Sequence, residues 1–82
     1  MTQDQIKKAI IDQILEIAPD IDKNDIIPDK NIQRSLEIDS FDFLKILTAL
    51  NDILGVEVPE KDYAKVDTID NMTQYFVKNL VQ

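Results

Sequence analysis

Hydrophobic residues recur at helical spacing near both ends of the chain. Residues 3–17 place an apolar side chain on each turn, which predicts an amphipathic helix that ends before Pro19. Residues 69–80 repeat this spacing, and Thr68 is suited to cap their N-terminal end. The predicted inner positions are Ile6, Ala9 or Ile10, Ile14 or Leu15, and Ile17 in the first helix, and Ile69, Met72, Phe76 and Leu80 in the last. Both segments are therefore predicted to pack by one face.

A third helical pattern covers residues 40–54 and is more apolar than a surface helix requires. Asp39 is a favourable N-cap because its carboxylate can accept the free amide hydrogens of the first turn, and Asp42 resembles its partner in a capping box. Gly55 suits the left-handed residue that ends many helices. One stripe holds Phe43, Ile46 and Leu50 with Leu54 or Ile53, whereas Phe41, Leu44 and Leu47 lie around the side. This excess predicts either a helix buried on most sides or exposed apolar positions that mark a partner site.

The connections between the predicted helices differ in length. Residues 18–38 lack sustained periodicity and contain two prolines, so we expect a long loop between helices 1 and 2. Four apolar side chains should pin this loop to the core: Ile26, Ile27, Ile32 and Leu36. Residues 60–65 have room for one short helical turn, and Pro59 prevents the segment before it from being a central strand. The sequence therefore predicts an all-α fold, a small three- to four-helix bundle, with residues 1–82 as a single domain.

The chain is acidic, with 16 acidic and 9 basic residues and a formal net charge of −7. This charge disfavours nucleic-acid binding and favours partners with basic surfaces. The N-terminal residues are polar, with no long apolar run behind them, which argues against a secretory signal or a membrane span. The chain has no cysteine, which excludes disulfides and is compatible with a reducing compartment. We therefore expect a cytoplasmic protein, and a monomer.

Ser40, at the start of the second predicted helix, is the residue of greatest chemical interest. It lacks the partners of a catalytic nucleophile, because the chain has no histidine and no glycine-flanked turn around this serine. One interpretation is an ordinary first-turn residue with no further role. Another is a residue that a second enzyme modifies. A phosphodiester on its oxygen would lie at a helix N-terminus, which stabilises negative charge by about 0.3–1 kcal/mol.

Metal binding and catalysis find little support in the sequence. Residues 20–24 begin like a calcium loop, but Asp25 and Asn31 stand where glycine and a bidentate glutamate are needed. Without cysteine or histidine, the usual zinc ligands are missing. No paired carboxylates indicate acid–base catalysis. We therefore predict no metal site and do not expect an enzyme.

Other short motifs lie before and after Asp39-Ser40-Phe41 along the chain. They are Leu36, Leu50, Gly55-Val56-Glu57-Val58-Pro59, Asp67-Thr68-Ile69 and Tyr75-Phe76. With these motifs the chain resembles the acyl carrier protein family over nearly its whole length. The family motif Asp-Ser-Leu begins the second helix, at the place of Asp39-Ser40-Phe41. Its occurrence in a small, acidic, helical chain makes the resemblance specific.

This resemblance implies a carrier that does no catalysis itself. Ser40 would hold a 4′-phosphopantetheine arm, transferred from coenzyme A by a phosphopantetheinyl transferase, and Asp39 would help to place magnesium in the transferase complex. The arm's thiol would carry acyl groups as thioesters for acyl-loading, acyl-transfer or synthase enzymes. By the same resemblance, partner contacts are expected at Phe41, Asp42, Lys45, Leu47 and Thr48. The space for the acyl chain would be lined by Ile46, Leu50, Ile69 and Phe76.

Several positions depart from the family pattern. Glu37 and Ile38 occupy a stretch where the family often has glycine. Lys45 and Asn51 replace acids that fatty-acid carriers usually present to basic synthase enzymes. These departures favour a specialised carrier for polyketide, modified-lipid or peptide synthesis over a housekeeping fatty-acid carrier. The alternative class is a helical protein–protein interaction module in which the serine stays unmodified.

Overall fold

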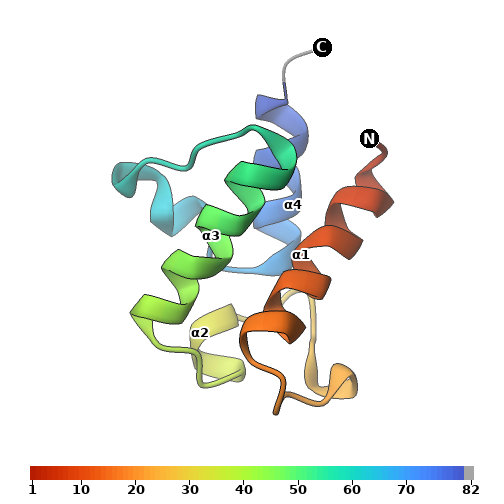
Figure 1. Ribbon diagram of the computed structural model, residues 1–82, viewed down its shortest axis with the longest axis vertical. Helices are drawn as coiled ribbons and strands as arrows, with labels where there is room; N and C mark the ends of the chain where they lie inside the picture. The colour runs from red at the N-terminus through yellow and green to blue at the C-terminus, as the bar shows by residue number, and fades with distance from the viewer. Residues whose placement is uncertain (81–82) are drawn as a thin grey trace.

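Three long α-helices form the body of the protein, as the computed structural model of residues 1–80 shows (Figure 1). The elements in chain order are α1 (Gln3–Ile17), η1 (Lys23–Asp25), α2 (Ile32–Ser35), α3 (Ser40–Leu54), η2 (Glu60–Val66) and α4 (Ile69–Asn79), where η denotes a 3-10 helix. Helix α1 packs against both α3 and α4, and η2 packs against α4. The prediction of an all-α bundle is therefore confirmed.

The long helices begin and end within one residue of their predicted bounds because their caps are local. Thr2 caps α1 through a complete capping box with Gln5. Thr68 caps α4, and its hydroxyl accepts a hydrogen bond of 3.0 Å from the amide of Asn71. Gly55 ends α3 in the left-handed conformation, with a φ of 71° that glycine adopts without steric cost.

One apolar core lies between the long helices. Helix α1 contributes Ile6, Ile10 and Ile14, which resolves the alternatives that the sequence pattern left open. Helix α3 contributes Phe43, Ile46, Leu47, Leu50 and Leu54, and α4 contributes Ile69, Met72 and Phe76. Leu80 follows the end of α4 and is only half-buried. Removal of these side chains from water, at about 25 cal/mol per Å² of apolar surface, is the main source of stability.

The segment between α1 and α3 is more regular than its sequence predicts. Instead of an unbroken loop over residues 18–38, it contains the 3-10 turn η1 and the short helix α2. Asn31 caps α2, and its side-chain oxygen accepts a hydrogen bond of 2.9 Å from the amide of Arg34. A four-residue helix is barely more than one turn, so it leaves no hydrophobic period in the sequence.

Three of the four apolar side chains predicted to pin this segment do so. Ile32 is buried, and Ile26 and Leu36 are partly buried against the core. Ile27 is 46% exposed, so the prediction that it packs inward is wrong. Ile26 has an extended backbone, and neighbouring side chains of an extended segment point in opposite directions, so only one of the pair faces the core.

Backbone hydrogen bonds fasten the same segment to the beginning of α4. The amide of Ile32 donates to the carbonyl of Asp67 at 2.8 Å, and the amide of Asp70 donates to the carbonyl of Pro28 at 3.0 Å. Asn31 and Thr68 form an isolated antiparallel bridge between these two bonds. The connection that leads into α3 is therefore held by α4 as well as by its own turns.

Candidate functional site

Ser40 is the first residue of α3, and its side chain is exposed. Asp39 caps the helix as predicted, and its carboxylate accepts a hydrogen bond of 2.8 Å from the amide of Asp42. The carboxylate of Asp42 lies 3.8 Å from the ammonium group of Lys45 instead of completing a capping box. The amides of Ser40 and Phe41 belong to the first turn, where helix carbonyls cannot accept them. The serine hydroxyl therefore lies at a helix end that suits negative charge.

The backbone just before the site adopts an unusual conformation at Glu37. Its φ of 53° is the left-handed value that costs a residue with a Cβ about 1–2 kcal/mol. The chain turns here from α2 toward α3, and the amide of Ile38 then donates to the carbonyl of Gln33 at 3.0 Å. The side chain of Ile38 enters the core. This strained turn, at the place where the family often has glycine, fixes the backbone three residues before Ser40.

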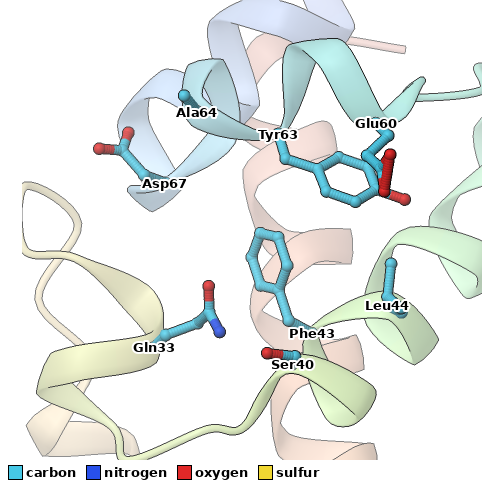
Figure 2. Close-up of a pocket in the computed structure, with 8 residues that line it drawn as sticks. All are labelled: Gln33, Ser40, Phe43, Leu44, Glu60, Tyr63, Ala64 and Asp67. Carbon is cyan, nitrogen blue, oxygen red and sulfur yellow. The ribbon is translucent and has the colours of Figure 1, made fainter.

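A hollow of about 410 Å³ opens beside Ser40, between α2, α3 and η2 (Figure 2). Figure 2 shows the rings of Phe43 and Tyr63 turned toward each other across it. The two rings meet edge to face, with centroids 6.5 Å apart and an interplanar angle of 82°. The other lining residues are Gln33, Leu44, Glu60, Ala64 and Asp67. A group attached to Ser40 therefore has a mostly apolar wall beside it.

The four residues expected to line an acyl-chain space lie deeper than this hollow. Ile46, Leu50, Ile69 and Phe76 are fully buried in the closed core. In this conformation the hollow reaches Phe43 and Tyr63 instead, so an acyl-lining role for the four stays a prediction. Helical periodicity identifies side chains that face inward, but it does not show where the packing leaves a space.

Tyr63 is the only aromatic residue among the lining residues that the sequence analysis missed; the others are Gln33, Glu60 and Ala64. Tyr63 belongs to η2, which has too few turns for a hydrophobic period to show which side chain faces α3. The available signal was an aromatic residue within a short polar turn. Its hydrophobic ring is partly buried against the core.

The apolar side chains of α3 are divided between the core and the surface. Five of its side chains enter the core, as a central helix requires. Phe41 is 76% exposed and Ile53 is 49% exposed, and Leu44 is exposed as well. Helix α3 is therefore a core helix that also presents apolar side chains to solvent.

Most of the predicted partner residues lie on the outer face of α3. Phe41, Lys45 and Thr48 are exposed and border a shallow hollow, while Asp42 is partly exposed. Leu47 is only 6% exposed, which corrects the expectation that it is available for partner contact. It lies four residues after Phe43, so the two side chains share the buried face of the helix. The side chain of Leu47 therefore packs in the core beneath α3.

Two other kinds of site find no support between residues 1 and 80. There, no group of three or more carboxylates is arranged to hold a metal ion. The helices of the same region are also too short or too polar to cross a membrane.

Known proteins match the chain over nearly all of the helical bundle. The family model described as "Phosphopantetheine attachment site" matches residues 8–76. An acyl carrier protein of Lactobacillus johnsonii is 36% identical over 75 residues, which are 92% of each chain. An acyl carrier protein of Rubrobacter xylanophilus is 26% identical over 76 residues, 89% of this chain and 94% of the relative. A meromycolate extension acyl carrier protein of Mycobacterium tuberculosis is 31% identical over 78 residues, 95% of this chain and 67% of the relative.

The matched range includes Asp39, Ser40 and every residue that lines the hollow. Members of the matched family are carriers and not enzymes, and their prosthetic group is 4′-phosphopantetheine. The resemblance that the sequence motifs indicated is thus confirmed. The chain belongs to the acyl carrier protein family, whose members bear phosphopantetheine.

Proposed function

We propose that Ser40 is the attachment point of the 4′-phosphopantetheine arm and that the chain carries acyl intermediates on it as thioesters. The observation that carries this proposal is the exposed Ser40 hydroxyl at the start of α3, directly after the capping residue Asp39. The chain has one other serine, Ser35. Its hydroxyl donates a hydrogen bond of 2.6 Å to the carbonyl of Asn31, so it is already engaged within α2.

The surroundings of Ser40 fit a phosphodiester. The amides and dipole at the beginning of α3 favour an anion there by about 0.3–1 kcal/mol. Phe43 and Tyr63 offer apolar contact beside the hydroxyl. When bound, the arm supplies the thiol that the chain itself lacks, since the sequence has no cysteine.

The modification needs a second protein, because the chain has no histidine to activate the hydroxyl. In the transferase complex, the oxygen of Ser40 would attack the phosphate that bears the pantetheine of coenzyme A. The oxygen–phosphorus bond forms as the phosphoanhydride bond breaks, the serine proton passes to a base of the transferase, and the adenosine bisphosphate leaves. By the family resemblance, the carboxylate of Asp39 helps to place the magnesium ion of that complex.

Intact-mass measurement tests the attachment. The purified protein is mixed with coenzyme A, magnesium and a broad-specificity phosphopantetheinyl transferase. We expect the parent and Ser35→Ala to gain one phosphopantetheine each, and Ser40→Ala to gain none. A gain of phosphopantetheine mass in Ser40→Ala would show that the arm is attached to another residue. If a folded parent gained no mass with several transferases, the proposal would be overturned. The alternative, a helical protein–protein interaction module with an unmodified serine, would then be favoured.

We propose further that the carrier serves a specialised polyketide, modified-lipid or peptide pathway instead of housekeeping fatty-acid synthesis. Lys45 supports this, because it places an exposed positive charge on the outer face of α3. Enzymes that grip an acidic helix with basic residues would be repelled there.

A rate comparison tests this pathway proposal. We expect the parent to be a poor malonyl acceptor for a fatty-acid malonyl transferase, and Lys45→Glu to be a better one. Lys65→Glu, which makes the same charge change on η2, is the control and should change the rate less. A parent that already accepts malonyl groups as fast as a fatty-acid carrier would contradict the specialised role.

We also propose that residues 1–82 form a single carrier domain and act as a cytoplasmic monomer. The shared core of α1, α3 and α4 supports the single domain. The net charge of −7 supports the monomer, because like charges on two copies repel each other. Light scattering at rising concentration tests the proposed monomer, and a mass that doubles would contradict it.

A further inference from the structure

Gln33, on the short helix α2, lines the hollow beside Ser40 with a polar side chain. Figure 2 shows its amide group extending from α2 toward Ser40 and Phe43. Within residues 1–80 this side-chain amide has no hydrogen-bond partner. The carboxylate of Asp67, which lines the same hollow, already accepts a hydrogen bond of 3.0 Å from the side-chain amide of Asn71. Gln33 therefore presents to the hollow an amide group that can still both donate and accept.

Backbone contacts fix the place from which this side chain extends. The carbonyl of Gln33 accepts a hydrogen bond of 3.0 Å from the amide of Ile38, just before α3. The preceding residue Ile32 is only 1% exposed, and its amide donates to the carbonyl of Asp67 at 2.8 Å. Helix α2 is thus held on both sides of Gln33. A group that enters the hollow has to immobilise only the side chain of Gln33, which keeps the entropic cost of binding small.

The arm proposed for Ser40 carries groups that match this lining. Its phosphodiester is followed by the pantoyl segment, which bears two methyl groups, a hydroxyl and an amide. Phe43, Leu44 and Tyr63 supply apolar surface on which the methyl groups can be removed from water. The hydroxyl and the amide of the same segment need polar partners when they leave water. Gln33 is the side chain of the hollow that can supply both a donor and an acceptor to them.

We infer that Gln33 holds the pantoyl segment of the arm in this hollow by hydrogen bonds, while Phe43 and Tyr63 contact its methyl groups. This inference rests on the proposed attachment at Ser40. The first half of the arm is then ordered on the carrier alone, before any enzyme binds. The second half, which ends in the thiol, remains mobile. Gln33 is thus a binding residue for the arm and takes no part in the transfer reaction.

NMR relaxation of the loaded protein tests this contact. The transferase attaches phosphopantetheine labelled with ¹⁵N at both amides, one nearer Ser40 and one nearer the thiol. In the parent, we expect the order parameter of the amide nearer Ser40 to be closer to about 0.85, the value of a rigid backbone, than to about 0.6, below which a group is flexible. The amide nearer the thiol should fall below about 0.6. Nuclear Overhauser contacts should join the side-chain amide protons of Gln33 to the pantoyl methyl groups.

Gln33→Leu removes the amide and keeps an apolar side chain, so both arm amides should be mobile in this variant. Gln13→Ala, on α1 and outside the hollow, is the control and should leave the arm as in the parent. The backbone amides of Ile32 and Arg34 should keep their order in Gln33→Leu, which separates a lost contact from a loosened α2.

Three results have opposite meanings for this inference and for the attachment. An arm equally mobile at both amides in the loaded parent, or an arm still ordered in Gln33→Leu, would overturn the role of Gln33 alone. The measurement on the parent decides the question even if the leucine variant does not fold by circular dichroism. Failure of the parent to gain mass would instead overturn the attachment at Ser40, and this inference with it.

Discussion

The hydroxyl of Tyr75 in α4 donates a hydrogen bond of 2.7 Å to the carboxylate of Asp62 in η2. This bond is the main cause of a lowered pKa at Asp62, whose ordinary value is 3.8, with Lys65 at 3.4 Å adding to the effect and partial burial opposing it. The same bond raises the pKa of Tyr75 above its ordinary value of 10.0. The position of the helix that carries Tyr63 is therefore linked to the ionisation of two side chains.

The Asp62–Tyr75 bond should make stability depend on pH at both extremes. The folded pKa of Asp62 is depressed, so its contribution is present above 3.8 and is lost as the pH falls through the lowered value. The folded pKa of Tyr75 is raised, so its contribution is present below 10.0 and is lost as the pH rises through the raised value. In Tyr75→Phe, we expect the NMR titration midpoint of Asp62 to move up toward 3.8. A midpoint identical to that of the parent would show that the bond does not form in solution.

Glu37→Gly should stabilise the protein. Relief of the left-handed backbone contributes about 1–2 kcal/mol, and the greater freedom of glycine in the unfolded chain offsets about 0.5–1 kcal/mol of this. We expect a net gain of about 0.5–1 kcal/mol in the free energy of unfolding, measured with urea. Glu37→Ala is the control, because it removes the charge and keeps the Cβ, and it should gain little. A glycine variant less stable than the alanine variant would contradict the strained turn.

The helices, and the helix end at which Ser40 lies, could be predicted because their signals are local. Asp39, Thr68 and Gly55 act on the backbone within one turn of their own positions, so each marks a helix end in the sequence itself. The apolar period of each long helix indicates its buried face in the same way. Ser40 was found from a short motif at one of these helix ends.

The lining of the hollow could not be predicted because it depends on contacts between distant elements. Tyr63 faces α3 because η2 is fastened to α4 by Asp62, 13 residues from its partner along the chain. Ile27 likewise lies in a segment without a hydrophobic period, so the sequence did not show that its side chain is exposed. The short helix α2 was not predicted because a single turn is too short to show a hydrophobic period in the sequence.

Loss of the cap at Asp39 should destabilise the beginning of α3. Asp39→Ala leaves the amide of Asp42 without its 2.8 Å acceptor, which should lower the free energy of unfolding by about 0.5–2 kcal/mol. Asp39→Asn keeps an oxygen acceptor and should lose much less. Urea unfolding measures both effects. Equal losses in the two variants would indicate that the charge of Asp39, and not the hydrogen bond, stabilises the helix.

Phe41→Ala should weaken partner binding without weakening the fold. The side chain is 76% exposed, so its removal should change the free energy of unfolding by no more than about 0.5 kcal/mol. An aromatic anchor that becomes buried in a partner is often worth 2 kcal/mol or more, so we expect the KM of a phosphopantetheinyl transferase for this carrier to rise by roughly tenfold or more. Ile53→Ala, at a position on the same helix that is 49% exposed but lies outside the hollow bordered by Phe41, should leave that KM unchanged. If both variants raised the KM equally, the transferase would be responding to the apolar character of α3 as a whole and not to the outer face around Phe41.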